Sequence, residues 1–375
     1  MRIILSLLLL VPFSRVSFSQ LFTQKVHINE EGIPVSSMKS ESMDPVMIQN
    51  LAYAIHKGVY PNIHSLLIAR NEKLVYEKYF DGYELIESDP PLKHFTKDNL
   101  HDLRSVTKSI TSACVGIAIA QGKIRSVDQK AFEFFPEYSK QDTGLKSAIT
   151  IKHLLMMASG LLWDENVPYT SNENTEIQMD DSGDPLKFIL ERPMQDTAGK
   201  SWNYSGGATQ LLGCIIEKAT GEKLDEFAKK FLFEPLGIKK FYWRKFAGID
   251  LSAAAWGLRL RPRDMLKFGL LYFNNGKWND KQIIPAGWVE ESLRSQIQRD
   301  SVGGGYGYQF WTWTGEIFDR PVQIGAAVGN GDQDIIIDKK NGLLIVATAG
   351  NYNKKIAKDV NAMLIDYIYP ALQKK

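Results

Sequence analysis

Strand signals lie at both ends of this chain, and a long run of helical signals lies between them. Residues 65–70 and 73–80 are rich in β-branched and aromatic residues around a polar turn, which predicts a hairpin. From residue 104 to about 246 the signals are mostly helical, and strand-like runs return after residue 253. This order predicts one sheet that is completed by N- and C-terminal parts of the chain. We therefore predict an α+β fold, with a mostly helical domain inserted into a domain built on an antiparallel sheet.

The places where these signals change give the expected boundaries. We predict a signal peptide at 1–19, a leader segment at 20–45, a discontinuous α/β domain at 46–103 and 254–375, and a helical domain at 104–253. A first helix is expected at 47–57 and a closing amphipathic helix at 356–372, so N- and C-terminal helices flank the predicted sheet. The remaining expected elements are helices at 151–158, from Pro185, at 207–220 and at 263–273, and strands at 306–313, 331–337 and 342–349.

Residues 103–122 are mostly small and apolar, which is typical of a buried helix, yet Ser105 and Lys108 lie near their start. A spacing of three places both side chains on one helix face, about one turn apart. Free amides at a helix N-terminus favour developing negative charge, and a lysine among apolar neighbours is able to act as a neutral base. The pattern therefore indicates an activated serine nucleophile. The spacing alone is a weak signal, because Ser36 and Lys39 repeat it in the polar leader.

Two further stretches carry polar groups at the ends of predicted elements. Tyr204 stands with Ser-Gly-Gly immediately before a predicted helix, where a tyrosine can point its hydroxyl into a cleft or satisfy it beneath the turn. Residues 329–333, Gly-Asn-Gly-Asp-Gln, precede a predicted strand. They offer either bare backbone amides to a ligand or a simple hairpin turn.

Taken in this order, the three stretches resemble the serine β-lactamase and penicillin-binding protein superfamily. The most similar branch holds class C β-lactamases, related esterases and 6-aminohexanoate-oligomer hydrolases. The resemblance runs from about residue 65 to 351 and is carried by Arg104–Ser109, Leu154–Leu161, Ser201–Gly207 and Gly257–Asp264.

This resemblance implies a β-lactamase/transpeptidase-like fold and a set of roles. Ser105 is the acylated nucleophile, and Lys108 and Tyr204 are the acid/base pair beside it, without a decision on which takes the serine proton. The oxyanion hole is expected at the backbone amides of Ser105 and Asn330. Tyr169, Gly206 and Gly329 are expected to contact substrate.

The chain departs from the family pattern at two positions of substrate recognition. The tyrosine motif usually has Asn two residues later, where this chain has Gly206, and the third motif usually begins with a cation, where it has Ala327. β-Lactams and cell-wall peptides carry a carboxylate that such a cation can pair with. We therefore expect an esterase or amidase that acts on small esters or amides and is poor on β-lactams. Arg259 or Arg261, in a neighbouring segment, is the alternative source of that cation.

Two hypotheses of different class remain at this point. The first is a secreted serine hydrolase that works through an acyl-enzyme, with a β-lactamase or D,D-peptidase as the alternative activity. The second is a binding protein that holds an antibiotic or cell-wall peptide without turnover. The joint presence of Ser105, Lys108 and Tyr204 favours the first, because a pure binder need not keep all three.

The N-terminus has the pattern of an exported protein. One basic residue and a short apolar run precede Ser17 and Ser19, so the mature chain is expected to begin near Gln20 and to be periplasmic or secreted. The run is shorter than the ~20 apolar residues of a spanning helix, and no stable membrane insertion is expected.

Composition and motifs exclude several other classes. A net charge of only +2 gives no indication of a nucleic-acid partner. The six histidines form no His-Glu-x-x-His motif and no close cluster, so no metal is expected, and no cofactor motif is present. Cys114 and Cys214 fall on predicted apolar helix faces and are expected to be buried thiols. The expected partner is a small ester or amide, and the expected state is a monomer.

Overall fold

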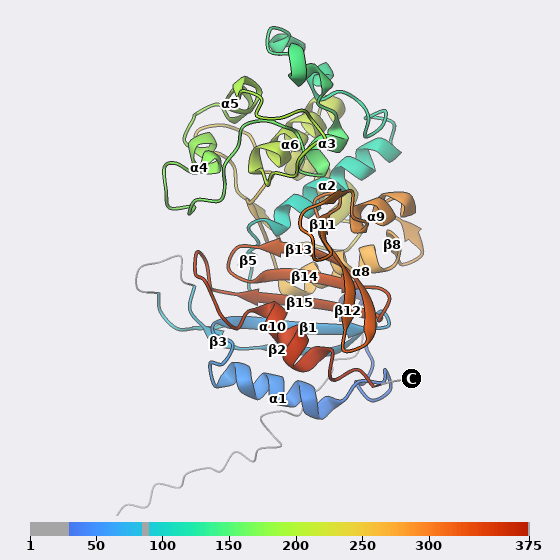
Figure 1. The fold of residues 1–375 in the computed structure, drawn as a ribbon. Coiled ribbons are helices and arrows are strands. Elements are labelled where there is room, and N and C mark those ends of the chain that lie inside the picture. The colour runs from blue at the N-terminus through green and yellow to red at the C-terminus, as the bar shows by residue number, and fades with distance from the viewer. Residues whose placement is uncertain (1–29, 85–89, 374–375) are drawn as a thin grey trace, which may run out of the picture.

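The computed structural model describes residues 30–84 and 90–373 (Figure 1). The predicted signal peptide and residues 20–29 of the leader lie outside this range. The α-helices are α1 Pro45–His56, α2 Val106–Ala120, α3 Ile151–Leu155, α4 Thr175–Asp180, α5 Pro185–Glu191, α6 Gly206–Thr220, α7 Leu224–Ala228, α8 Pro262–Phe273, α9 Ala286–Leu293 and α10 Val360–Met363. The short 3₁₀ and π-helices are η1 Glu30–Gly32, η2 Ala131–Phe134, η3 Pro136–Tyr138, η4 Gly144–Ala148, η5 Lys229–Phe233 and η6 Leu364–Ile368.

An eight-stranded antiparallel sheet is the largest sheet in the described part of the chain. Its order is β10-β11-β12-β13-β14-β15-β1-β2, and the pairing of β1 with β15 joins the N-terminal part of the chain to the C-terminal part. The predicted sheet completed from both ends is therefore confirmed. The strands of this sheet are β1 Ile63–Arg70, β2 Lys73–Tyr79, β10 Ile297–Gln298, β11 Gly304–Tyr306, β12 Trp311–Ile317, β13 Arg320–Gly329, β14 Gln333–Asp338 and β15 Leu343–Ala349.

Smaller sheets complete the strand content. They are β3 Asp81–Gly82 with β4 Lys93–His94, β5 His101–Asp102 and β6 Tyr242–Trp243 on either side of β7 Leu258–Leu260, and β8 Lys277–Trp278 with β9 Lys281–Gln282.

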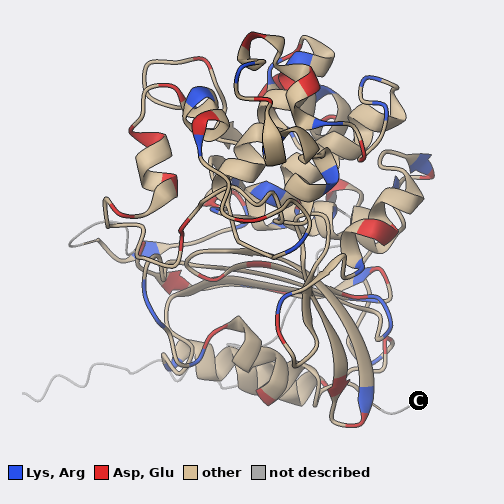
Figure 2. Cartoon of the chain, turned by 45° about the horizontal axis from the view of Figure 1, so that its top comes forward, with Lys and Arg blue, Asp and Glu red and all other residues tan. Residues whose placement is uncertain are grey.

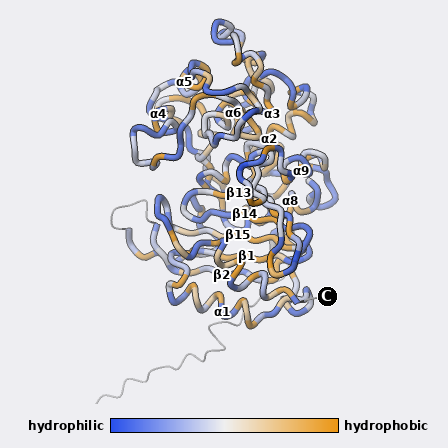
Figure 3. The backbone as a smooth tube through the Cα atoms, viewed as in Figure 1, coloured by the Kyte–Doolittle hydropathy of each residue, from blue (hydrophilic) through white to orange (hydrophobic). Residues whose placement is uncertain are grey.

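Each face of the large sheet is covered by its own hydrophobic core. Along β1, Leu66 and Ile68 pack with α1, α10 and η6, whereas Leu67 and Ala69 pack on the opposite face with α2 and α8. Because successive strand residues point to opposite faces, a strand that is buried on both sides reads as a continuous apolar run. Helix α1, which covers one face of the sheet, is buried on one side only, and Figure 3 shows hydrophobic and hydrophilic residues recurring along it.

Helix α2 connects the sheet to the helical region above it (Figure 1). Residues 106–118 of α2 are all buried, and the helix packs against α6 and against β13. Helices α3 and α5 in turn pack on α6. The start of α2 therefore lies where the sheet and the helical region meet. Charged residues of both signs are distributed over both regions (Figure 2), in keeping with the small net charge.

The predicted strand at 306–313 is wrong as a single element. β11 ends at Tyr306 and β12 begins at Trp311, because a buried turn at Gln309 separates them. Gln309 has a φ of 64°, and its side-chain amide donates to the carbonyl oxygens of Leu154 and Leu155 at 3.0 Å each. These bonds tie the hairpin to the helical region, a constraint that strand propensity does not contain.

The C-terminal elements also differ from the expectation. The closing helix is shorter than 356–372, since α10 begins after the capping residue Asp359 and continues as the π-helix η6 to Ile368. Strand β13 was not predicted, because Pro321, Gly325 and Gly329 interrupt its apolar pattern. A Cβ on Gly325 would lie 2.5 Å from Leu293, so close packing requires that glycine.

Candidate active site

A strained turn presents Ser105 at the mouth of α2. Arg104, the residue before it, has a φ of 48°, in the left-handed region that residues other than glycine rarely adopt. The backbone amide of Arg104 donates to the Asp102 carboxylate at 3.3 Å, which fixes the turn. Ser105 then occupies the N-cap position of α2 and is half-buried. Strain of this kind is typical of functional sites, where the surrounding structure holds it in place.

Lys108 lies directly beside the serine. Its Nζ donates to Ser105 Oγ at 3.1 Å and to the Ala255 carbonyl oxygen at 3.1 Å, and the side chain is 1% exposed. The same Nζ lies 3.8 Å from Glu176 Oε1. The structure therefore brings the two residues of the Ser-x-x-Lys pattern into hydrogen-bond contact. Lys39, in the repeated pattern of the leader, is exposed.

Tyr204 completes the group around the serine hydroxyl. It precedes α6, whose N-cap is Ser205, and Lys108 Nζ lies 4.9 Å from the centroid of its ring. Burial, followed by the negative charge of Glu165, raises the pKa of Tyr204 well above its ordinary value, while a hydrogen bond with Ser105 acts in the opposite direction. Tyr204 is therefore a neutral phenol near neutral pH, and its hydroxyl is able both to donate and to accept a hydrogen bond.

Aromatic side chains form a wall behind this tyrosine. The ring of Trp311 stacks on Tyr204 with centroids 5.4 Å apart and an interplanar angle of 26°. Trp202 and Tyr306 pack edge-on or tilted against the same pair. This packing holds the Tyr204 ring, since an aromatic cluster restricts the rotation of each member.

The end of β13 lies next to the nucleophile. β12 pairs with β13 only as far as Ala326, so residues 327–329 have no partner from β12 on that side. A Cβ on Gly329 would lie 2.2 Å from the carbonyl oxygen of Leu103, so this strand end rests against the segment that leads into Ser105. The side chain of Asn330 is bonded to Asn353 at 2.7 Å. The Asn330 side chain is thus engaged by Asn353, and the oxyanion role of the Asn330 backbone amide stays a prediction.

Two carboxylates near Lys108 were not identified from the sequence. Glu165 accepts hydrogen bonds from Trp163 Nε1 at 2.5 Å, from Tyr169 at 2.8 Å and from the backbone amide of Gly206. Glu176 is 4% exposed and approaches Gly206 so closely that a Cβ there would lie 1.8 Å from its Oε1. Tyr169 and Gly206, both predicted to contact substrate, are thus engaged by an acidic pair.

Glu176 escaped sequence reasoning because it resembles an ordinary helix-capping acid. Asn174 caps α4, and an acidic residue in the first turn is expected there on electrostatic grounds alone. The signal that pointed to it was indirect. A glycine at position 206, where the resemblance implies an asparagine, leaves space that another side chain must fill.

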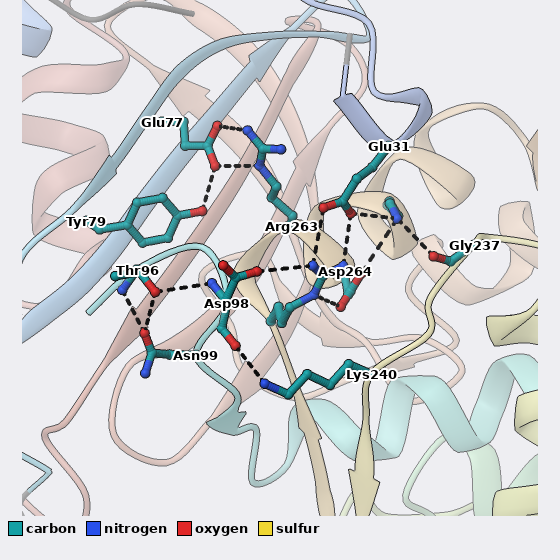
Figure 4. A network of polar contacts seen from close by, with 12 residues as sticks. Glu31, Glu77, Tyr79, Thr96, Asp98, Asn99, Gly237, Lys240, Arg263 and Asp264 are labelled. Carbon is teal, nitrogen blue, oxygen red and sulfur yellow. Dashed lines mark hydrogen bonds and ion pairs between the residues drawn. The ribbon is translucent and has the colours of Figure 1, made fainter. Parts of the chain in front are cut away.

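Both arginines suggested as the replacement cation, Arg259 and Arg261, are paired with carboxylates. Arg261 is held by Asp264 and Glu31, its side chain is 13% exposed, and Glu31 also pairs with Lys267. Glu31 and Asp264 lie close together in the polar network of Figure 4. Arg259 lies 3.7 Å from Asp102, which it shares with Arg104 and Arg244 at 3.6 Å each. The Arg261 charge is therefore already paired with two carboxylates, whereas Arg259 is a half-exposed member of an arginine cluster.

Within residues 30–84 and 90–373, no group of three or more His, Cys, Asp or Glu side chains is placed to hold a metal ion. None of the helices in these ranges is long and apolar enough to cross a membrane. Cys114 and Cys214 are buried free thiols, as predicted.

Comparison with known proteins agrees with this geometry. The Beta-lactamase family model matches residues 58–361, which is more than half of the chain. Over 216 residues the chain is 27% identical to the N-acetylmuramyl-L-alanine amidase of Bacillus subtilis, covering 56% of this chain and 48% of that protein. Over 181 residues it is 27% identical to Esterase EstB of Burkholderia gladioli, covering 46% of this chain and 45% of that protein.

A solved structure confirms the predicted fold class. The octameric penicillin-binding protein homologue from Pyrococcus abyssi has a TM-score of 0.62 and 20% identity, covering 87% of this chain and 76% of that chain. The β-lactamase/transpeptidase-like fold is therefore shown, while this level of identity carries no statement about substrate. The chain spans less than half the length of the two curated relatives named here.

Proposed function

The chain belongs to the beta-lactamase family, and on that premise we propose that it is a serine hydrolase that cleaves small esters or amides through an acyl-enzyme on Ser105. One observation carries this proposal. Lys108 Nζ lies 3.1 Å from Ser105 Oγ, and the Tyr204 hydroxyl is bonded to the same serine. A nucleophile in contact with two proton-transfer groups is the arrangement that acyl transfer requires.

The proposed reaction uses these groups in two steps. Ser105 Oγ attacks the substrate carbonyl carbon while its proton passes to the neutral amine of Lys108, and the carbonyl electron pair moves onto oxygen. The backbone amides of Ser105 and Asn330 stabilise that oxyanion. Collapse expels the alcohol or amine, which leaves with a proton from Lys108 or Tyr204. Water then attacks the acyl-serine, and the acid is released as the serine regains its proton.

The proton-transfer roles of Lys108 and Tyr204 are assigned from their surroundings. Because burial and the Glu165 charge raise the pKa of Tyr204, the phenolate is scarce near neutral pH. We therefore assign the first proton transfer to Lys108. Tyr204, as a neutral hydroxyl, relays the proton to the leaving group.

Substrate preference follows from the two positions at which the site lacks the family pattern. Ala327 is 1% exposed within the core beneath β13, and the space beside Gly206 is taken by the Glu176 carboxylate. A substrate carboxylate thus finds no cation at position 327. We expect kcat/KM for an aryl butyrate to exceed that for a chromogenic cephalosporin by at least about 100-fold, a difference of about 2.7 kcal/mol in transition-state binding.

The control for this prediction is Arg259→Ala, since Arg259 belongs to the arginine cluster near Asp102. We expect that variant to leave the ratio of the two kcat/KM values unchanged. A preference of the parent for the cephalosporin, lost in Arg259→Ala, would identify Arg259 as the missing cation and favour the β-lactamase alternative. Stoichiometric binding without turnover of either compound would favour the binding-protein hypothesis.

We also propose that the protein is exported. Support comes from the sequence of residues 1–19, with its short apolar run and small residues before Gln20. Expression in a bacterium with its own leader should yield periplasmic or secreted protein whose first residue, by N-terminal sequencing, lies near Gln20. Exported protein that retains Met1 would contradict the predicted cleavage.

A further inference from the structure

Glu176 fills the space that a side chain at position 206 would otherwise take. A Cβ built on Gly206 would lie 1.8 Å from Glu176 Oε1 and 3.1 Å from Glu165 Oε1. Both distances are shorter than ordinary van der Waals contact. Any residue larger than glycine at this position must therefore displace the Glu176 carboxyl group.

The same oxygen of Glu176 faces the amine that contacts the nucleophile. Glu176 Oε1 lies 3.8 Å from Lys108 Nζ, and the two side chains are 6% and 1% exposed. Among the described residues, this oxygen has no hydrogen-bond partner, although it is buried. A buried carboxylate oxygen without such a bond is costly unless a nearby charge compensates it. Lys108 supplies that charge, so the two groups depend on each other.

Other charged and titratable groups surround this pair. Glu165 lies on the segment before α4, Asp180 one turn later on α4, and Arg104 before α2. Burial, followed by the Glu165 charge, raises the pKa of Glu176, while Lys108 lowers it. The hydroxyls of Tyr169 and Tyr204 also face Glu176, whose charge contributes to the raised pKa of both.

We propose that Glu176 is a positioning residue for Lys108: its carboxyl group fixes the amine beside Ser105 and sets the pH range in which that amine accepts the serine proton. This inference rests on the proposed function, because it assigns a task within that acyl-transfer site. Gly206 belongs to the same arrangement, since only glycine at that position leaves room for the Glu176 carboxyl group.

The direction of the pH effect follows from the sign of the charge. A carboxylate beside an ammonium favours the protonated amine. Glu176→Gln keeps the shape and removes the charge, so the amine becomes free at lower pH. The acidic limb of kcat/KM for the aryl butyrate should therefore move to lower pH, by less than the effect of a full charge, because burial raises the pKa of Glu176 to about 8 and leaves the carboxyl group only partly ionised below that pH. A role in packing alone would leave that limb where it is.

The matched control is Glu173→Gln. Glu173 precedes α4 by two residues and is exposed, so this variant removes the same charge from the same segment without touching Lys108. We expect its pH profile to coincide with that of the parent. Equal shifts in both variants would mean a general field effect and would overturn the proposal.

A second set of variants tests the role of Gly206. Gly206→Ala must push Glu176 Oε1 aside, so it should move the acidic limb in the same direction as Glu176→Gln. In a Glu176→Ala background the two closest contacts of the added methyl group are gone, and Gly206→Ala should then cause little further change. Additive shifts in the double variant would show that the two positions act separately.

The outcomes separate this inference from the proposed function. If the parent hydrolyses neither esters nor amides and a serine probe leaves Ser105 unmodified, the proposed function fails. If the parent is active but the acidic limbs of parent and Glu176→Gln coincide, only the role of Glu176 fails. Unfolding midpoints of all variants, measured in parallel, identify any loss that is due to misfolding.

Discussion

Replacing Ser105 with alanine is expected to abolish both ester hydrolysis and covalent labelling by a serine-directed probe. The loss in kcat should be roughly 10³- to 10⁶-fold, because no other nucleophile replaces an acylated serine. The unfolding free energy should change by no more than about 1 kcal/mol, since Ser105 is half-buried and its hydroxyl bonds only within the site. Rates at saturating substrate and a denaturation curve test the two halves of this expectation.

The leader provides a control for Ser105→Ala. Ser36 stands three residues before Lys39, the same spacing as Ser105 and Lys108, but Lys39 is exposed. Ser36→Ala should label and hydrolyse like the parent. Undiminished labelling of the Ser105→Ala variant would remove Ser105 as the nucleophile.

Lys108→Ala and Tyr204→Phe are each expected to lower kcat/KM by orders of magnitude, and the double variant should be little worse than either. Groups that act in one proton-transfer unit are strongly non-additive, because loss of one member already disables the step. Losses that multiply in the double variant would show that the two residues act in separate steps. Steady-state kinetics on the aryl butyrate, normalised to folded protein, give the comparison.

The unfolding free energy of the Lys108→Ala variant must be measured together with its kinetics, because Lys108 also compensates the charge of Glu176. Removing Lys108 leaves the buried Glu176 carboxyl group without its cation. Because burial already raises the pKa of Glu176, that group can take up a proton, so the loss should be smaller than the ~3–5 kcal/mol of a broken buried ion pair. Lys267→Ala is the matched control, since Lys267, on α8, is likewise 1% exposed and is paired with Glu31 and Asp264. That variant should lose stability but retain the catalytic rate per folded molecule.

The architecture could largely be predicted because its signals are local. Helices α1, α6 and α8 each follow from apolar periodicity with a cap, a glycine or a proline at the boundary, and the β1–β2 hairpin follows from two β-rich runs around a polar turn. The errors lie where distant contacts decide local structure. Gln309 makes a turn because it binds carbonyl groups of residues 154 and 155, and nothing within a few residues of it indicates those partners.

The candidate site likewise contains residues that the sequence predicts and residues that only the structure identifies. Ser105 and Lys108 share one helix, so their contact follows from the spacing, and Tyr204 follows from the order of motifs. Glu165 and Glu176 lie on a loop and a short helix whose placement depends on the whole fold. The sequence therefore does not show that these two acids belong to the site. That becomes clear only in the structure, where a carboxyl group fills the space beside Gly206.

Peptide mapping by mass spectrometry after inactivation with an aryl phosphonate serine probe tests the central claim most directly. The probe should modify Ser105 alone, and the fraction of modified Ser105 should equal the fraction of hydrolytic activity lost. Modification of a different residue in step with the loss of activity, or full inactivation with Ser105 unmodified, would contradict an acyl-enzyme on Ser105.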